Sequence, residues 1–238
     1  NEKLGKKIYI TGKGRCNVTN ACDTEELFRN VVHNAKFLYS SFYTFTNTDV
    51  MDLIEKHGCL LKTERGGRVF PVSDKSSDVI HALTVALREL GVEVELHEEV
   101  SGVLAEDGHV SGVRLKRGQK VVPADAVIVT TGGLSYPSTG STGDGYRFAT
   151  ELGHTITELS PALVPFEAKE AVCKDLQGLS LRNTGVQLRD EKGKTVYQDF
   201  GELLFTHFGV SGPTVLSASA HLKPGKSYSL VLDLKPAL

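Results

Sequence analysis

The sequence predicts an α/β domain that holds a nucleotide-like ligand, followed by a second, mainly β domain. The most informative segment is residues 131–145, which contains five glycines and follows the apolar run 126–129. That run is typical of a buried parallel strand, and residues 145–152 are expected to form a helix that Gly153 ends. A strand, a glycine-rich loop and a helix in this order favour a ligand at the carboxyl end of a sheet. After about residue 155, short β-like segments replace the helix signals.

The glycine-rich loop has properties that suit an anionic or sugar-containing ligand. Glycine allows positive φ and a close approach between ligand and backbone, and the start of the following helix offers unpaired N–H groups. Gly143 and Asp144 stand at that helix start, where a carboxylate can accept hydrogen bonds from sugar hydroxyls. The alternative interpretation is a glycine-rich turn that binds nothing.

Helices are predicted within residues 24–57 and from residue 76 to 90, where apolar residues recur at helical spacing. The residues expected to begin or end these helices are Asp23 or Thr24, Thr46 or Asn47, Gly58, Ser76 or Ser77, and Gly91.

Strands are expected next, at residues 92–96, 100–104, 109–116 and 119–122. The last three are joined by the hairpin signals Asp107-Gly108 and Arg117-Gly118. The predicted domains are residues 1–158 and residues 159–238, the second of which is expected to be rich in β-structure.

Composition excludes several classes of protein. The net charge of −2 argues against a general nucleic-acid binder, and no apolar run approaches the ~20 residues of a membrane span. The four cysteines form no C-x-x-C pair, so the sequence predicts neither a metal site nor a disulfide framework. A reducing, cytoplasmic setting is therefore expected.

Residues 12–17 place two glycines and two cations within four positions, which predicts an electropositive concavity suited to phosphate. The run is neither a P-loop nor a G-x-G-x-x-G loop, because Asn17 stands where the last glycine should be. A solvated basic turn is the alternative. Cys16, beside Arg15, is a candidate thiol of lowered pKa, although a small buried side chain is the interpretation that the sequence favours.

Two further segments contain candidate functional residues. Arg65 and Arg68 suit a carboxylate or a phosphate, or else lie on the surface. His207, within residues 205–213, is a candidate acid or base, although a lone histidine is more often structural. No Ser-His-Asp triad or catalytic pair of carboxylates is evident from the spacing.

Together, residues 12–20, 65–71, 131–145 and 205–213 resemble, in order and spacing, four blocks of the BaiN/YhiN-like (aminoacetone-oxidase-like) FAD-dependent oxidoreductases. The resemblance covers essentially the whole chain. It implies an FAD/NAD(P)-binding Rossmann-like α/β domain, similar to that of the glutathione-reductase superfamily, with an inserted, mainly β, barrel-like domain. It also implies an internal piece of a longer chain, because the family's first strand with its G-x-G-x-x-G loop and its C-terminal FAD-closing segment have no counterpart here.

The same resemblance implies roles for individual residues. Val100 would lie at the adenine, and the Ser135–Pro137 group near the flavin ring, which makes Tyr136 a weak catalytic candidate. His207 would face the flavin from the inserted domain. The residues implied to approach the rest of the cofactor are Gly12, Lys13, Gly14, Arg15, Cys16, Asn17, Thr131, Gly132, Gly133, Gly143 and Asp144.

The resemblance implies an oxidoreductase that transfers a hydride equivalent between FAD and a small organic substrate. Both amine oxidation and alkene reduction fit it, with oxygen or NAD(P)H as the second redox partner. A non-catalytic nucleotide-binding module or scaffold is the alternative. A nucleotide-dependent transferase that uses Asp144 is a weaker alternative, because the chain has no P-loop.

Overall fold

The computed structural model describes residues 1–235, which form two compact units, one over residues 1–157 and one that begins at Glu158. The N-terminal unit contains six α-helices among the described residues: α1 (Lys6–Ile10), α2 (Thr24–Arg29), α3 (Tyr39–Thr44), α4 (Asn47–Lys56), α5 (Ser76–Glu89) and α6 (Asp144–Glu151). Residues 24–57, predicted to be helical, are therefore helical in pieces, with a short 3₁₀ turn at Ala35–Leu38 between α2 and α3.

Side-chain caps set the starts of two helices, as predicted. Asp23 accepts a hydrogen bond from Glu26 N at the start of α2. Thr46 and Asp49 form a reciprocal capping box at the start of α4. Both devices satisfy backbone N–H groups that have no partner within the helix.

Two small antiparallel sheets complete the N-terminal unit. The first has the strand order β1-β3-β2, with β1 at Thr19–Asn20, β2 at Leu61–Thr63 and β3 at Arg68–Pro71. The second has the order β4-β5-β6, with β4 at Val100–Glu106, β5 at His109–Leu115 and β6 at Val121–Pro123. The hairpin between β4 and β5 turns at Asp107-Gly108, which confirms the hairpin signal in the sequence.

The core of this unit lies beneath α4 and α5. Ile54, Val79 and Ala82 are buried together with Cys16 and Cys59. This packing fixes Cys16 against the two helices. Residues 12–17 are therefore held in place by the buried side chain of Cys16.

The structure corrects two strand predictions. Residues 92–96 and 126–129 are not strands, and their apolar side chains face solvent, with Ile128 87% and Val94 43% exposed. Every strand pair in residues 1–235 is antiparallel. A buried parallel strand needs hydrogen-bonded neighbours, and no described segment pairs with either run.

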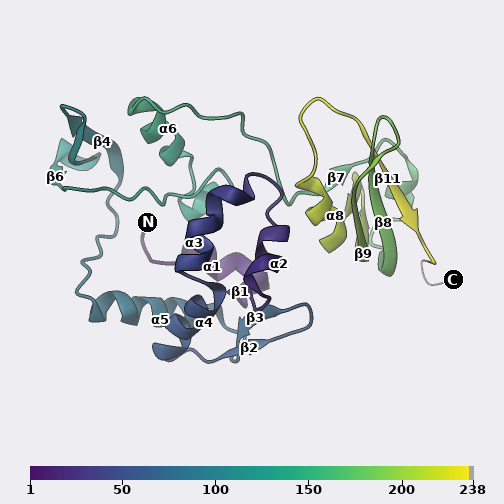
Figure 1. Cartoon of the computed structure of the whole chain (residues 1–238), viewed down its shortest axis with the longest axis horizontal. Coiled ribbons are helices and arrows are strands. Elements are labelled where there is room, and N and C mark those ends of the chain that lie inside the picture. Colours follow the sequence, from purple (N-terminus) through teal and green to yellow (C-terminus); the bar gives the residue numbers. More distant parts are fainter. Residues whose placement is uncertain (236–238) are drawn as a thin grey trace. The chain divides into compact units, whose positions relative to one another are not determined.

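The C-terminal unit is built around one five-stranded antiparallel sheet, in the order β11-β8-β9-β10-β7. Figure 1 shows the long strands side by side with α8 against them. Val186, Leu203 and Val215 form its core. The order is open, and closure into a barrel stays a prediction. The bounds of its elements are β7 Phe166–Glu167, α7 Val172–Asp175, β8 Ser180–Asp190, β9 Thr195–Thr206, β10 Gly209–Ser211, α8 Pro213–Ser219 and β11 Tyr228–Asp233.

Residues 1–235 contain neither a candidate membrane-spanning helix nor a candidate metal-binding cluster. None of their helices has the length and apolar character required to cross a membrane. No group of three or more His, Cys, Asp or Glu side chains within them could hold a metal ion.

Candidate nucleotide site

A cavity of about 570 Å³ in the N-terminal unit brings together residues that are far apart in the sequence. Three of the predicted cofactor residues, Val100, Thr131 and Asp144, line it. The other lining residues come from the N-terminus, the segment before β4, the glycine-rich loop and α6: Asn1, Glu2, His97, Glu98, Glu99, Gly140, Thr142 and Phe148. The structure therefore joins the predicted adenine position to the glycine-rich loop.

The glycine-rich loop is closely packed around its glycines, as Gly132 and Gly143 show. Gly132 has φ of 73°, and a Cβ added there would lie 2.6 Å from Ser141 Oγ. Gly143, at the N-cap of α6, has φ of 86°, and an added Cβ would lie 2.7 Å from Leu134 Cδ2. Both positions therefore require glycine, which explains the composition of this loop.

Asp144 begins α6 and presents a charged carboxylate to the cavity. Thr142 Oγ1 donates a hydrogen bond to Oδ2 at 2.6 Å, and Arg147 Nη2 donates one to Oδ1 at 3.1 Å. These bonds, with that from Thr142 the stronger influence, lower the pKa of Asp144. An ionised carboxylate at this position can accept hydrogen bonds from sugar hydroxyls.

Val100 offers the cavity a backbone donor and acceptor. Val100 pairs with Leu115, while Glu99 O accepts a hydrogen bond from Lys116 N at 2.7 Å. In an antiparallel ladder, the residue that follows such a bond turns its own N–H and C=O to the opposite edge. Since β4 is an edge strand, this pair of groups matches the acceptor and amino group on one edge of adenine.

The charges around the cavity suit adenosine better than phosphate. Glu2, Glu98, Glu99 and Asp144 supply carboxylates, and no Lys or Arg is among the residues that line it. Carboxylates accept hydrogen bonds from ribose hydroxyls and amino groups, whereas they repel phosphate. The donor set therefore fits the adenosine part of FAD and does not fit its diphosphate.

The structure places residues 12–17 elsewhere in the unit, beside the sheet β1-β3-β2. Arg15 is held between two carboxylates: Nε donates to Asp74 Oδ1 at 2.8 Å, and Nη2 forms an ion pair with Glu64. The guanidinium also lies 4.1 Å from the centre of the Phe70 ring. The charge of Arg15 is therefore already compensated within the protein.

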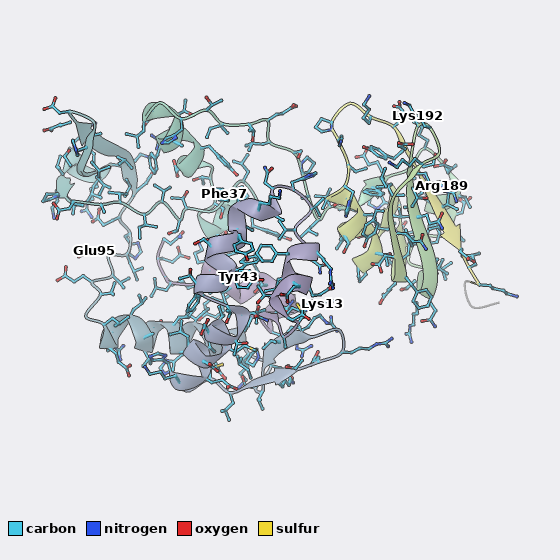
Figure 2. The ribbon with its side chains drawn as sticks, viewed as in Figure 1. Lys13, Phe37, Tyr43, Glu95, Arg189 and Lys192 are labelled. Carbon is cyan, nitrogen blue, oxygen red and sulfur yellow. The ribbon has the colours of Figure 1, made fainter. Side chains whose placement is uncertain are left out.

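The other residues of this loop differ from Arg15. Lys13 is exposed at φ of 58°, and its side chain is labelled in Figure 2. Gly12 has φ of 56°, and an added Cβ would meet Asn17 N at 2.8 Å, so the turn is closely packed. Cys16 is only 6% exposed, and burial raises the pKa of its thiol. The interpretation of Cys16 as a low-pKa nucleophile was therefore wrong, and the buried alternative is confirmed.

The arginines of residues 65–71 lie at the surface. Arg65 and Arg68 are both exposed, and Arg68 Nε donates to Arg65 O at 3.3 Å. The Arg68 guanidinium is 5.9 Å from the centre of the Phe70 ring. Neither side chain lines the cavity described above.

Tyr136 is held in a conformation that is rare for a bulky residue. Its φ of 54° lies in the left-handed region, and its side chain is 67% exposed. Thr139 fixes the turn, because its backbone N and its Oγ1 both donate to Tyr136 O, at 2.9 and 2.7 Å. Backbone conformations of this kind cluster at functional sites, which keeps Tyr136 as a candidate.

His207 lies in the turn between β9 and β10 of the C-terminal unit and is exposed. Its ring meets Phe208 edge-on at 4.9 Å. In the same unit, Tyr197 donates to Asp199 Oδ2 at 2.9 Å, and its ring meets that of His221 in a tilted contact at 4.7 Å. Burial, followed by the bond to Asp199, raises the pKa of Tyr197 to about 12. No local sequence pattern indicates this polar cluster, because it joins residues of β9 to the segment after α8.

Sequence reasoning also missed Lys7. Its Nζ donates to Ser135 O at 2.7 Å and to Ser141 Oγ at 2.6 Å. These bonds join α1 to the glycine-rich loop across more than a hundred residues of sequence, which no local pattern could reveal.

A profile of the HI0933-like protein Rossmann domain matches residues 1–221. The chain belongs to this family of FAD-binding flavoproteins. The resemblance seen in the four sequence blocks is thereby confirmed, and so is FAD as the family's cofactor.

Curated relatives of the chain carry two different names. Two are ribosomal RNA dihydrouridine synthases: that of Escherichia coli (strain K12) is 31% identical over 97% of this chain and 56% of the relative, and that of Haemophilus influenzae is 32% identical over 99% and 57%. The 3-dehydro-bile acid delta(4,6)-reductase of Clostridium scindens is 30% identical over 100% and 57%. The chain thus spans about half the length of the curated relatives it matches.

Proposed function

We propose that the protein containing this chain is an FAD-dependent reductase of carbon–carbon double bonds conjugated to a carbonyl group. The observation that carries the proposal is the cavity that joins Val100, Thr131 and Asp144 and suits the adenosine of FAD. Family membership supports the cofactor. The names of the relatives support the type of reaction.

The two names describe the same chemistry on different molecules. Formation of dihydrouridine saturates the C5=C6 bond of uracil, which is conjugated to a carbonyl. A delta(4,6)-reductase of a 3-oxo bile acid acts on double bonds conjugated to the 3-oxo group. In both cases a hydride equivalent adds to an electron-poor carbon of the conjugated system, which is β to the carbonyl in uracil and β or δ to it in the dienone, and a proton completes the saturated bond. Neither name describes amine oxidation.

Bound FAD would supply the hydride equivalent, with NAD(P)H as the proposed source of electrons. The residues of this chain would bind and orient the cofactor through the cavity and the glycine-rich loop. Tyr136 is the proposed proton donor from the N-terminal unit, because its exposed hydroxyl is carried by a strained and well-supported turn. His207 is the alternative from the C-terminal unit.

The names of the relatives imply different substrates. The net charge of −2 favours a small molecule over a nucleic acid, whereas two of the relatives are named for ribosomal RNA. The proposal is therefore restricted to the conjugated alkene that both substrate classes contain. The absence of nucleic-acid partners stays a prediction.

The test uses the complete protein with FAD bound and NADPH as reductant, without oxygen. A ribosomal RNA transcript and a steroid with a conjugated 3-oxo group are supplied in parallel, and mass spectrometry detects addition of two hydrogens. A saturated product from either substrate supports the proposal and selects the substrate class. Oxidation of a primary amine by the same protein, with neither alkene reduced, would overturn it.

A further inference from the structure

Lys7 is a cation without a carboxylate partner at the edge of the adenosine cavity. Its side chain is half-buried, and its two hydrogen bonds go to uncharged oxygens, Ser135 O and Ser141 Oγ. An ammonium group has three N–H donors. Within residues 1–235 the third donor of Lys7 has no acceptor, so one N–H remains for a ligand.

The neighbouring cations differ from Lys7 because each is paired with a carboxylate that lines the cavity. Lys6 pairs with Glu2 at 3.2 Å, Lys116 with Glu99 at 2.8 Å, and Arg147 with Asp144 at 3.1 Å. Their charges therefore compensate the cavity's own acids. The charge of Lys7 is not compensated in this way.

The position of Lys7 relative to the cavity follows from the two ends of the glycine-rich loop. Thr131 and Thr142 line the cavity. The residues next to them are Gly132 and Ser141, and both approach Lys7: an added Cβ on Gly132 would lie 4.0 Å from Nζ, and Ser141 Oγ accepts its hydrogen bond. At each end of the loop, Lys7 therefore approaches the residue that is next in sequence to one lining the cavity.

In FAD the group attached directly to adenosine is the diphosphate. Adenosine in the cavity would place that anion at its edge, among residues where carboxylates no longer dominate. We propose that Lys7 binds the diphosphate of FAD with its free N–H. The other two N–H groups hold the glycine-rich loop in place through Ser135 O and Ser141 Oγ. Arg15, the cation that the sequence offered for this role, is occupied by Glu64 and Asp74.

This inference rests on the family's cofactor and not on the proposed reaction, so its test needs no substrate. Calorimetric titration of the complete protein, after removal of its flavin, measures the affinities for ADP and for adenosine. The variants are Lys7→Gln, which removes the charge, and Lys7→Arg, which keeps it. Lys3→Gln is the matched control, because Lys3 is an exposed lysine of the same segment that lies over the Tyr9 ring and is not among the residues that line the cavity.

Lys7→Gln should weaken ADP binding about 10-fold or more, since a charge-assisted hydrogen bond is lost, and should leave adenosine binding unchanged. The loss for ADP should shrink as salt rises. Lys7→Arg should retain most of the ADP affinity, and Lys3→Gln should match the parent. The proposal is overturned if Lys7→Gln weakens ADP and adenosine equally, because Lys7 would then act only by supporting the loop, or if ADP affinity does not change.

The variant Ser141→Ala distinguishes a disturbed loop structure from a loss of the Lys7 charge. That variant removes one partner of the Lys7 ammonium but leaves the charge in place. It should preserve the preference for ADP over adenosine even if both affinities fall. Loss of that preference in Ser141→Ala would contradict a direct role for the charge.

Discussion

At the scale of single residues, the glycine-rich loop depends on backbone conformations that few residues other than glycine adopt. Gly132 and Gly143 have positive φ, and the density of glycines in the sequence indicated this. The signal at residues 12–17 was two cations separated by one glycine, but the sequence could not show that Glu64 and Asp74 meet Arg15 from distant segments. Lys7 was missed for the same reason, since its partners lie at positions 135 and 141.

Asp144→Asn should lower the affinity of the complete protein for FAD about tenfold, because a neutral amide replaces a charged acceptor in the cavity. Fluorescence titration with FAD measures the change. Glu151→Gln is the matched control, since Glu151 also pairs with Arg147 from α6 but does not line the cavity. Equal effects of the two substitutions would show that Asp144 acts only through Arg147.

Arg15→Ala should lower the thermal midpoint while leaving the affinity for FAD at low salt unchanged. The substitution removes the ion pairs of Arg15 with Glu64 and Asp74, which leaves Lys62 as the one cation paired with these carboxylates among residues 1–235, and it removes the packing of the guanidinium on Phe70. Differential scanning fluorimetry and FAD titration give the two readouts. A salt-sensitive loss of FAD affinity would instead return Arg15 to the role that the sequence suggested.

At the scale of helices and strands, the predictions succeeded where the signal was local. The caps at Asp23 and Thr46 and the hairpin at Asp107-Gly108 depend on neighbours within a few residues, and all three are present. The strands expected at 92–96 and 126–129 depend on partners elsewhere in a sheet. Their apolar composition is typical of strands, but composition cannot show whether a neighbour is present with which a strand could pair.

Thr46→Ala should destabilise the N-terminal unit by about 1 kcal/mol, because the capping box at the start of α4 loses its side-chain acceptor. Urea unfolding followed by circular dichroism measures the change. Thr48→Ala, an exposed position in the same helix, should have a much smaller effect. A Thr48 effect as large as the Thr46 effect would exclude the cap as the cause.

The same cap predicts a dependence on pH. The hydrogen bond from the Thr46 hydroxyl, followed by that from its backbone N–H, lowers the pKa of Asp49. A carboxyl whose pKa is lower in the folded state contributes stability above its unfolded pKa and loses it as the pH falls through the folded value. The stability difference between the parent and Asp49→Asn should therefore be present at neutral pH and close in acid. A difference that does not change with pH would contradict this linkage.

At the scale of the whole molecule, the chain spans about half the length of its relatives, and two of its apolar segments face solvent. The Rossmann-like domain implied by the family needs parallel strands, for which residues 92–96 and 126–129 have the appropriate composition. The sequence therefore indicated the family from its motifs, although the parallel sheet itself is not formed by residues 1–235.

Hydrogen exchange should show directly whether residues 92–96 and 126–129 pair as strands. In residues 1–238 alone, amides of 92–96 and 126–129 should exchange rapidly, because no strand pairs with them. In the complete protein the same amides should be protected, while those of β4 and β5 should be protected in both. Rapid exchange of both segments in the complete protein would refute the prediction that they join a parallel sheet.

We propose that this chain builds the adenosine end of an FAD site. The most direct test is to purify the complete protein, record its visible absorbance, and identify the cofactor released on denaturation. Flavin absorbance with FAD as the released molecule is the predicted result. Release of FMN, which lacks adenosine, or a colourless protein that takes up no added FAD, would contradict the claim.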